Sequence, residues 1–92
     1  REVEIELATV AERRRNVELA DQQVELAAET HEQVARQYEV GLATSLDMQN
    51  AASELAAKRL ARVLDRLRYD LAVLSLRKAV GEYAALSAVE ER

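Results

Sequence analysis

The strongest constraint on the fold of this chain is the near absence of residues that interrupt a helix. Its 92 residues include no proline and only two glycines, Gly41 and Gly81. Proline and glycine are the residues least compatible with a helix interior, and Gly41 lies near the middle of the chain. The sequence therefore predicts two long helices, over about residues 2–40 and 45–88, joined by a tip turn at 41–44.

The predicted turn carries signals for ending one helix and starting the next. Gly41 suits the left-handed backbone conformation that follows many helix C-termini. Thr44 stands three residues before Asp47, a spacing typical of a capping box, and an acid there also interacts favourably with the helix N-terminus. We therefore expect an all-α antiparallel coiled-coil hairpin, a single unit over residues 1–92, with helices about 60 Å long. Because the chain begins with Arg1, we expect it to be part of a longer protein.

Composition supports long helices and excludes several functions. One third of the residues are charged, and the chain has no Phe, Trp or Cys, a profile typical of coiled coils. The formal net charge is −4 and both signs are interspersed, so no basic face for nucleic acid is predicted. The lack of Cys excludes thiolate chemistry, and no apolar run is long enough to cross a membrane.

Apolar residues recur every seven positions in both predicted helices. The first stripe consists of Val3, Val10, Val17, Val24, His31 and Tyr38 in one helix and of Leu46, Ser53, Leu60, Leu67, Leu74 and Gly81 in the other. A strict seven-residue repeat predicts a left-handed supercoil. We expect these two stripes to face each other, with Val17 in the layer of Leu67 and Val24 in the layer of Leu60. In this register Arg13 would lie opposite Asp70. Glu6 would lie opposite Arg77.

A second stripe begins two residues further along and lies about 200° around each helix. It contains Ile5, Leu19, Leu26 and Val40, followed in the second helix by Met48, Leu55, Tyr69, Leu76 and Tyr83. A hairpin buries only one face of each helix, so we expect this stripe to stay exposed and to mark an interface. For lateral packing between hairpins we select Leu19, Leu26, Leu55, Tyr69, Leu76 and Tyr83. Periodicity alone leaves open a self-associating four-helix bundle or a larger ring.

The sequence contains no group of residues suited to catalysis. His31 lies opposite Ser53 in the expected register, which predicts a polar layer that sets the register. A single His with scattered acids does not supply the several ligands that a metal site needs. No serine is paired with a histidine by spacing. We therefore predict that the chain is not an enzyme and holds no metal or cofactor.

The turn and the helix after it resemble the TolC-like outer membrane efflux protein family. That family has a Tyr-x-x-Gly turn, a Thr or Ser, a Leu-Asp start to the next helix, and a downstream helix with a Tyr and an Ala-Leu-Gly ending. The matching residues here are Tyr38, Gly41, Thr44, Leu46, Asp47, Ala51, Tyr69, Leu76 and Gly81. The resemblance covers roughly residues 35–83.

The resemblance implies an outer membrane channel whose periplasmic tunnel is built from helical hairpins, of which this chain is one. Contact with the membrane is then made only by other parts of the protein. The hairpin tips would meet a periplasmic adaptor protein, which links the channel to an inner-membrane pump. It implies an adaptor-docking tip formed by Val40, Gly41, Leu42 and Thr44. It also implies a gating or pore-entrance role for Tyr38, Asp47 and Asn50.

Three residues depart from the family pattern. Asn50 stands where a second acid is common, so an acidic ring at the entrance would carry less charge. Ala43 replaces a basic gating residue found in some members, and Gln49 replaces an apolar residue. The alternative to a channel component is a generic coiled-coil oligomerisation or interaction module.

Overall fold

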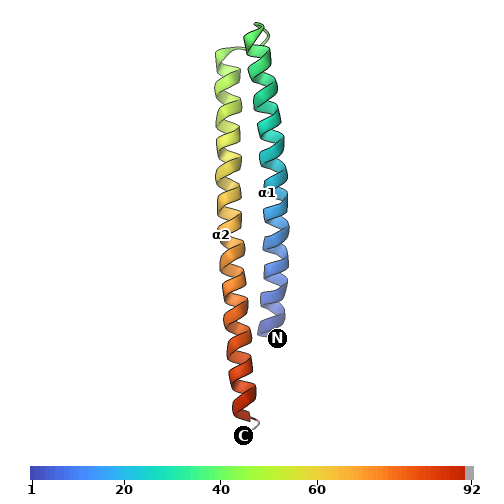
Figure 1. Ribbon diagram of the computed structural model, residues 1–92, viewed down its shortest axis with the longest axis vertical. Helices are drawn as coiled ribbons and strands as arrows, with labels where there is room; N and C mark the ends of the chain where they lie inside the picture. Colours follow the sequence, from blue (N-terminus) through green and yellow to red (C-terminus); the bar gives the residue numbers. More distant parts are fainter. Residues whose placement is uncertain (91–92) are drawn as a thin grey trace.

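The structure, a computed structural model, is a hairpin of two long antiparallel helices (Figure 1). It describes the backbone of residues 1–90 and the side chains of residues 1–88. Helix α1 spans Glu2–Glu39 and helix α2 spans Ser45–Glu90, and the Cα atoms extend over 77 × 14 × 13 Å. The predicted fold class is confirmed, and both helices begin and end within two residues of the predicted bounds.

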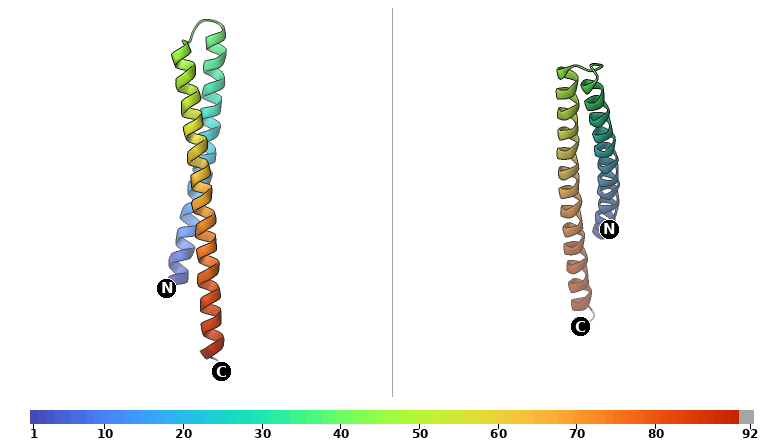
Figure 2. Two further views of the ribbon diagram at one scale, coloured as in Figure 1. Left: turned by 90° about the vertical axis from the view of Figure 1, so that its left-hand side faces the viewer. Right: turned by 45° about the horizontal axis from the view of Figure 1, so that its top comes forward.

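The turn lies at one end of the hairpin and both chain ends lie at the other, where α2 extends past the start of α1 (Figure 1). In the turned view α2 crosses in front of α1, so the helices coil around each other (Figure 2). The hairpin is therefore at most two helices thick, and each helix has a broad face that the other does not cover.

The face of α1 that contacts α2 is the predicted one. Its residues are spaced alternately by three and four positions, and all are buried or half-buried: Val3, Glu6, Val10, Arg13, Val17, Ala20, Val24, Ala27, His31 and Val34. Only Tyr38, at the tip end of the predicted stripe, is exposed. The seven-residue repeat thus identified the inner face of α1 over almost its whole length.

The face of α2 that contacts α1 is the opposite of the predicted one. Leu46, Leu60, Leu67 and Leu74 are all exposed, and Leu67 retains 53% of its accessible surface. The inner face is instead lined by buried and half-buried residues spaced three or four apart: Met48, Ala51, Leu55, Lys58, Arg62, Asp65, Tyr69, Ala72, Leu76 and Ala79. The expected register is wrong as well, because Val24 and Ala27 pack on Leu55, and Val17 shares a hollow with Arg62, Val63 and Arg66.

Small side chains explain this choice of face. Among residues 1–88, six apolar residues are buried, and four of them are alanines: Ala20, Ala27, Ala72 and Ala79. Alanine at a contact position lets two helices approach closely, whereas a row of leucines would hold them further apart. The sequence contains two heptad stripes on α2. The stripe with Leu55, Tyr69 and Leu76 has alanines between its large residues, and it packs against the alanines of α1.

Because α2 presents the other face to α1, its polar contacts also differ from those that we expected. Asp70 pairs with Arg66 of its own helix at 3.5 Å rather than with Arg13. All four ion pairs found among residues 1–88 join positions three or four apart in one helix. Ser53 is exposed while His31 is half-buried, so the predicted His31–Ser53 layer does not form. The described side chains give no cross-helix ion pair that fixes the register.

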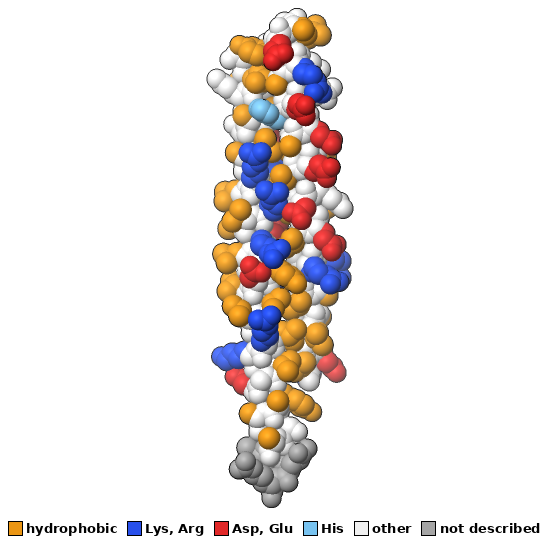
Figure 3. Space-filling model, in the orientation of Figure 1, with side chains coloured by type: hydrophobic (Ala, Val, Ile, Leu, Met, Phe, Trp, Pro, Cys, Tyr) orange, Lys and Arg blue, Asp and Glu red, His pale blue; other side chains and the backbone are white. Residues whose placement is uncertain are grey.

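The outward face of α2 carries five leucines, which we call the leucine seam: Leu60, Leu64, Leu67, Leu71 and Leu74. Each keeps between 42% and 60% of its surface exposed. Figure 3 shows apolar side chains exposed along the hairpin between charged ones. The hairpin therefore leaves a large apolar surface in contact with water.

Candidate functional site

The candidate site is the hairpin tip, and its first part is the end of α1. The N–H of Leu42 donates to the carbonyl of Gln37 at 2.7 Å, and the N–H of Gly41 donates to the carbonyl of Tyr38 at 3.2 Å. Gly41 has a φ of +82°, the only positive φ among residues 1–90. These two bonds and the left-handed glycine form a Schellman motif, which satisfies the last carbonyl groups of the helix.

The second part of the tip is the start of α2, where the predicted capping box is confirmed. The backbone N–H of Thr44 donates to Oδ2 of Asp47 at 2.8 Å, and the N–H of Asp47 donates to Oγ1 of Thr44 at 3.1 Å. Two N–H groups that the helix itself cannot pair are thereby satisfied. The turn between the helices is therefore fixed by hydrogen bonds at both of its ends.

These bonds also set the charge state of Asp47. The hydrogen bond from the Thr44 backbone, followed by the bond with its side chain, lowers the pKa of the Asp47 carboxyl below 3.8. Donors that point at a carboxylate favour its charged form. Asp47 is consequently an anion at neutral pH, held in place in the first turn of α2.

Apolar side chains at the tip are left in water by this arrangement. Val40 is 70% exposed and Leu42 is 79% exposed, the highest value among the exposed large hydrophobic residues. In a Schellman motif the residue after the glycine often packs on an apolar residue five positions earlier, but here that position is Gln37. Around Gly41 there is open space. Val40, Gly41 and Leu42 thus form an apolar end surface on a rigid turn.

The residues that we selected for gating lie on the same end of the molecule. Tyr38 is in the last turn of α1, while Asp47 and Asn50 are in the first two turns of α2, and all three are exposed. Tyr38 is 48% exposed and Leu46 is 63% exposed, so neither side chain is buried between the helices at the tip. A gating role for these residues stays a prediction.

The residues that we selected for lateral packing separate into two groups. Leu19, Leu26 and Tyr83 are exposed, as that role requires. Leu55 is only 8% exposed and packs on Val24 and Ala27, so its assignment to the outward stripe is wrong. Tyr69 and Leu76 are half-buried, because they lie on the face of α2 that contacts α1.

Sequence reasoning missed Leu64 and Leu71. The predicted stripe holds only every seventh residue, whereas Leu64 and Leu71 stand four residues after Leu60 and Leu67. The signal that identifies them is the alternation of four- and three-residue spacings from Leu60 to Leu74.

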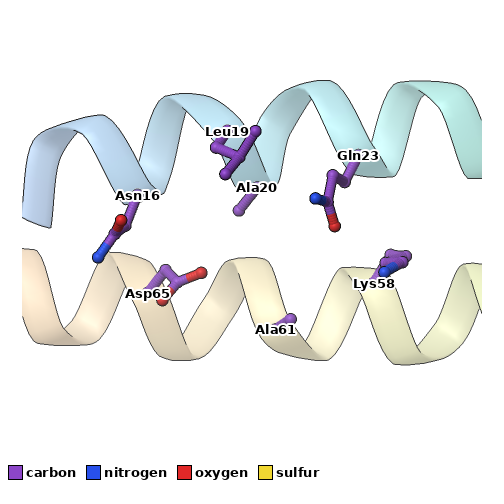
Figure 4. Close-up of a pocket in the computed structure, with 7 residues that line it drawn as sticks. All are labelled: Asn16, Leu19, Ala20, Gln23, Lys58, Ala61 and Asp65. Carbon is purple, nitrogen blue, oxygen red and sulfur yellow. The ribbon is translucent and has the colours of Figure 1, made fainter.

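One flank of the hairpin is hollowed between the helices. Figure 4 shows Asn16 and Gln23 extending from α1 towards α2, and Asp65 rising from α2 towards α1. Leu19 and Ala61 line the same hollow. It is shallow and carries both apolar and polar groups, which suits a side chain from a neighbouring surface better than an enclosed small molecule.

Neither a metal site nor a membrane-spanning helix is found in the described part of the chain. No three His, Asp or Glu side chains there are grouped closely enough to hold a metal ion. Neither described helix has a stretch that is long and apolar enough to cross a membrane.

Comparison with known protein families gives one clear result. The model of a family described as "Outer membrane efflux protein" matches residues 1–82. Comparisons with curated proteins and with solved structures found no match. The matched segment contains α1, the whole tip and most of α2, so the match includes every residue of the candidate site. The chain belongs to the outer membrane efflux protein family.

Proposed function

We propose that this hairpin is a periplasmic part of an outer membrane efflux channel, where it forms a section of the tunnel wall and docks a periplasmic adaptor protein through its tip. The single observation that carries the docking proposal is the exposure of Val40 and Leu42 on either side of Gly41. Family membership supports the channel role.

The tip has the properties of a small docking surface. Its backbone is fixed by the Schellman motif and by the capping box, so little conformational entropy is lost when a partner binds. Gly41 has no neighbour within 4 Å of a Cβ placed on it, which leaves room for a partner to approach the backbone. Isolated apolar residues on a turn have no structural role when they pack on nothing, so we assign Val40 and Leu42 to partner contact.

The body of the hairpin has the properties of a wall element. Two helices that expose apolar residues on their outward faces need neighbours on both sides to cover them. Leu19 and Leu26 lie on the outward face of α1, and the leucine seam lies on the outward face of α2. The mechanism is then structural: hairpins packed side by side enclose the tunnel, and Asp47 places a fixed negative charge near its end.

The test is a double substitution, Val40→Ser with Leu42→Ser, in the full-length efflux protein that carries this hairpin. Both side chains are exposed and the capping bonds use backbone atoms or Thr44 and Asp47, so folding is retained. We expect the protein to reach the outer membrane in normal amount but to lose cross-linking to the adaptor and to lose export. Leu7→Ser is the control, since Leu7 is an exposed leucine far from the tip and outside the two outward stripes.

Unchanged adaptor cross-linking in the double variant would contradict docking through the tip. If export and adaptor binding were both independent of every exposed apolar residue on the hairpin, the chain would act as a coiled-coil oligomerisation module instead.

A further inference from the structure

We propose that one particular flank of the hairpin lines the tunnel, and that α1 contributes uncharged amide and hydroxyl side chains to this lining. The inference rests on the wall role proposed above and goes beyond it, because it assigns an inside and an outside to the hairpin. It also names the chemistry that a passing solute meets.

The two flanks of the hairpin lie on either side of the contact between α1 and α2, and their side chains differ. On one of them, which we call the neutral flank, α1 places an uncharged polar residue at five successive seven-residue repeats: Thr9, Asn16, Gln23, Thr30 and Gln37. Two hollows beside α2 are lined by Asn16, Gln23 and Thr30, which locates this row on the structure. One third of the chain is charged, so five uncharged repeats in a row set this flank apart.

Helix α2 adds charges to the neutral flank, but each is balanced by a neighbour on the same helix. The hollows there include Glu54, Lys58 and Asp65 (Figure 4 shows the last two). Nζ of Lys58 lies 3.7 Å from the carboxylate of Glu54, and the guanidinium of Arg68 lies 3.3 Å from that of Asp65. The two acids and two bases cancel, so this part of the flank carries no net charge.

The opposite flank, which we call the charged flank, has a different character. Its hollow is lined by Asp21, Arg62 and Arg66. Glu18 and Glu25 stand three residues before and four residues after Asp21, so they lie beside it on the helix surface. They belong to a row of exposed glutamates that recurs every seven residues and is interrupted only by Ala11: Glu4, Glu18, Glu25, Glu32 and Glu39. Helix α1 therefore has an uncharged side and an acidic side.

The outward apolar residues of α1 are displaced towards the neutral flank. In a supercoiled helix with 3.5 residues per turn, Leu19 and Leu26 lie about 130° from the middle of the inner face, measured across the neutral flank. The structure agrees, because both side chains line the hollows on that flank. The mirror-image position on the other side holds Glu18 and Glu25. A neighbouring hairpin that covers the leucines therefore contacts α1 on the side of the neutral flank.

The leucine seam of α2 is displaced in the same direction. Leu64 and Leu71 lie about 130° from the middle of the inner face across the neutral flank, and the other three members lie opposite that face, so the middle of the seam is at about 155°. In a closed ring of helices, the two contacts of each helix enclose less than 180° on the inner side of the ring. Both helices meet this condition on the neutral flank, so a ring of these hairpins has the neutral flank inside.

Repulsion between like charges favours the same orientation. Side chains on the outer surface of a ring diverge from those of neighbouring copies, whereas side chains on the inner surface converge. The glutamate row of α1 is spread apart on the outside, where distance and salt weaken the repulsion. Inside, amides and hydroxyls both donate and accept hydrogen bonds. The body of the tunnel therefore suits polar and amphiphilic organic solutes whatever the sign of their charge.

Charge added by chemical modification tests this orientation in the full-length efflux protein. Gln23→Cys places a thiol on the neutral flank, and Asp21→Cys places one on the charged flank at the same level. Both positions are exposed, and residues 1–92 contain no other cysteine. Each variant, with any cysteine elsewhere in the protein replaced by serine, is inserted into a planar lipid bilayer. It is then treated with a methanethiosulfonate that carries either a sulfonate or a trimethylammonium group.

The reversal potential in a salt gradient reports which thiol lines the tunnel. At about 0.1 M salt the screening length is about 10 Å, close to the diameter of one helix. We expect the sulfonate on Gln23→Cys to shift the potential towards cation selectivity and the trimethylammonium group to shift it towards anion selectivity. Asp21→Cys should react to the same extent by mass spectrometry and give a much smaller shift, because its charge is screened outside the wall. Thr30→Cys and Glu32→Cys form a second pair that should repeat the difference.

Three results would overturn the proposal. The first is a larger shift for Asp21→Cys than for Gln23→Cys, and the second is an equal shift for both. The third is no shift in any of the four variants while their pores conduct normally. A full-length protein that forms no pore contradicts the channel role itself, and the lining falls with it. Adaptor cross-linking that persists after the double substitution at the tip contradicts docking alone and leaves the lining unaffected.

Discussion

Thr44 and Asp47 exchange two hydrogen bonds, one from each backbone N–H to the side chain of the other residue. This pair closes the turn of the hairpin onto the first turn of α2 and fixes the direction in which α2 leaves the tip. The apolar end surface at Val40 and Leu42 is rigid because of this pair and the Schellman motif before it.

Removing the side chain of Thr44 should destabilise the hairpin. Thr44→Ala eliminates the bond to the Asp47 N–H, and loss of an N-cap side chain costs about 1 kcal/mol of the free energy of unfolding. Urea denaturation followed by circular dichroism measures this change. Thr30→Ala is the control: its hydroxyl bonds to the Leu26 carbonyl inside α1, and alanine has the higher helix propensity. A loss at Thr30 as large as that at Thr44 would contradict the capping argument.

The charge of Asp47 should make hairpin stability depend on acid pH. Because the folded pKa is lower than the reference value of 3.8, the contribution of Asp47 is fully present above that value. It is lost as the pH falls through the folded pKa. NMR titration of the Asp47 carboxyl should give a pKa below 3.8. Thr44→Ala should raise this pKa part of the way back, since the backbone N–H at position 44 still donates.

The two glycines should respond to alanine in opposite directions. Gly41 has a φ of +82°, and a side chain in the left-handed region costs about 1–2 kcal/mol, so Gly41→Ala should destabilise the hairpin. Gly81 lies inside α2 with open space around it, and alanine favours the helix there by about 1 kcal/mol. Thermal unfolding of both variants checks the signs. Equal effects of the two substitutions would show that the left-handed turn does not form.

Alanine substitutions of two leucines of α2 test which face of this helix contacts α1. Leu55→Ala removes a buried side chain from its contact with Val24 and should cost about 2 kcal/mol. Leu60→Ala changes a residue that is 60% exposed and should stay within about 0.5 kcal/mol. Both are measured by urea denaturation followed by circular dichroism. The reverse order would place Leu60 on the inner face of the hairpin.

Local features of the tip were predictable because they depend on neighbouring residues only. Gly41, Thr44 and Asp47 act within one or two helical turns, so their spacing in the sequence already defines the bonds that they make. The exposure of Val40 and Leu42 is of the same kind, since Gln37 offers no apolar partner. Family resemblance supplied the interpretation of these residues as a docking surface.

The sequence by itself determined two helices, their ends, and the inner face of α1, because helix breakers, caps and heptad spacing are properties of one segment at a time. Only the tertiary structure decided which face of α2 meets α1. Both stripes of α2 repeat every seven residues, so periodicity does not choose between them. The choice depends on how closely the two backbones approach, and the alanines at Ala20, Ala27, Ala72 and Ala79 allow close contact when α2 turns Leu60, Leu67 and Leu74 outward.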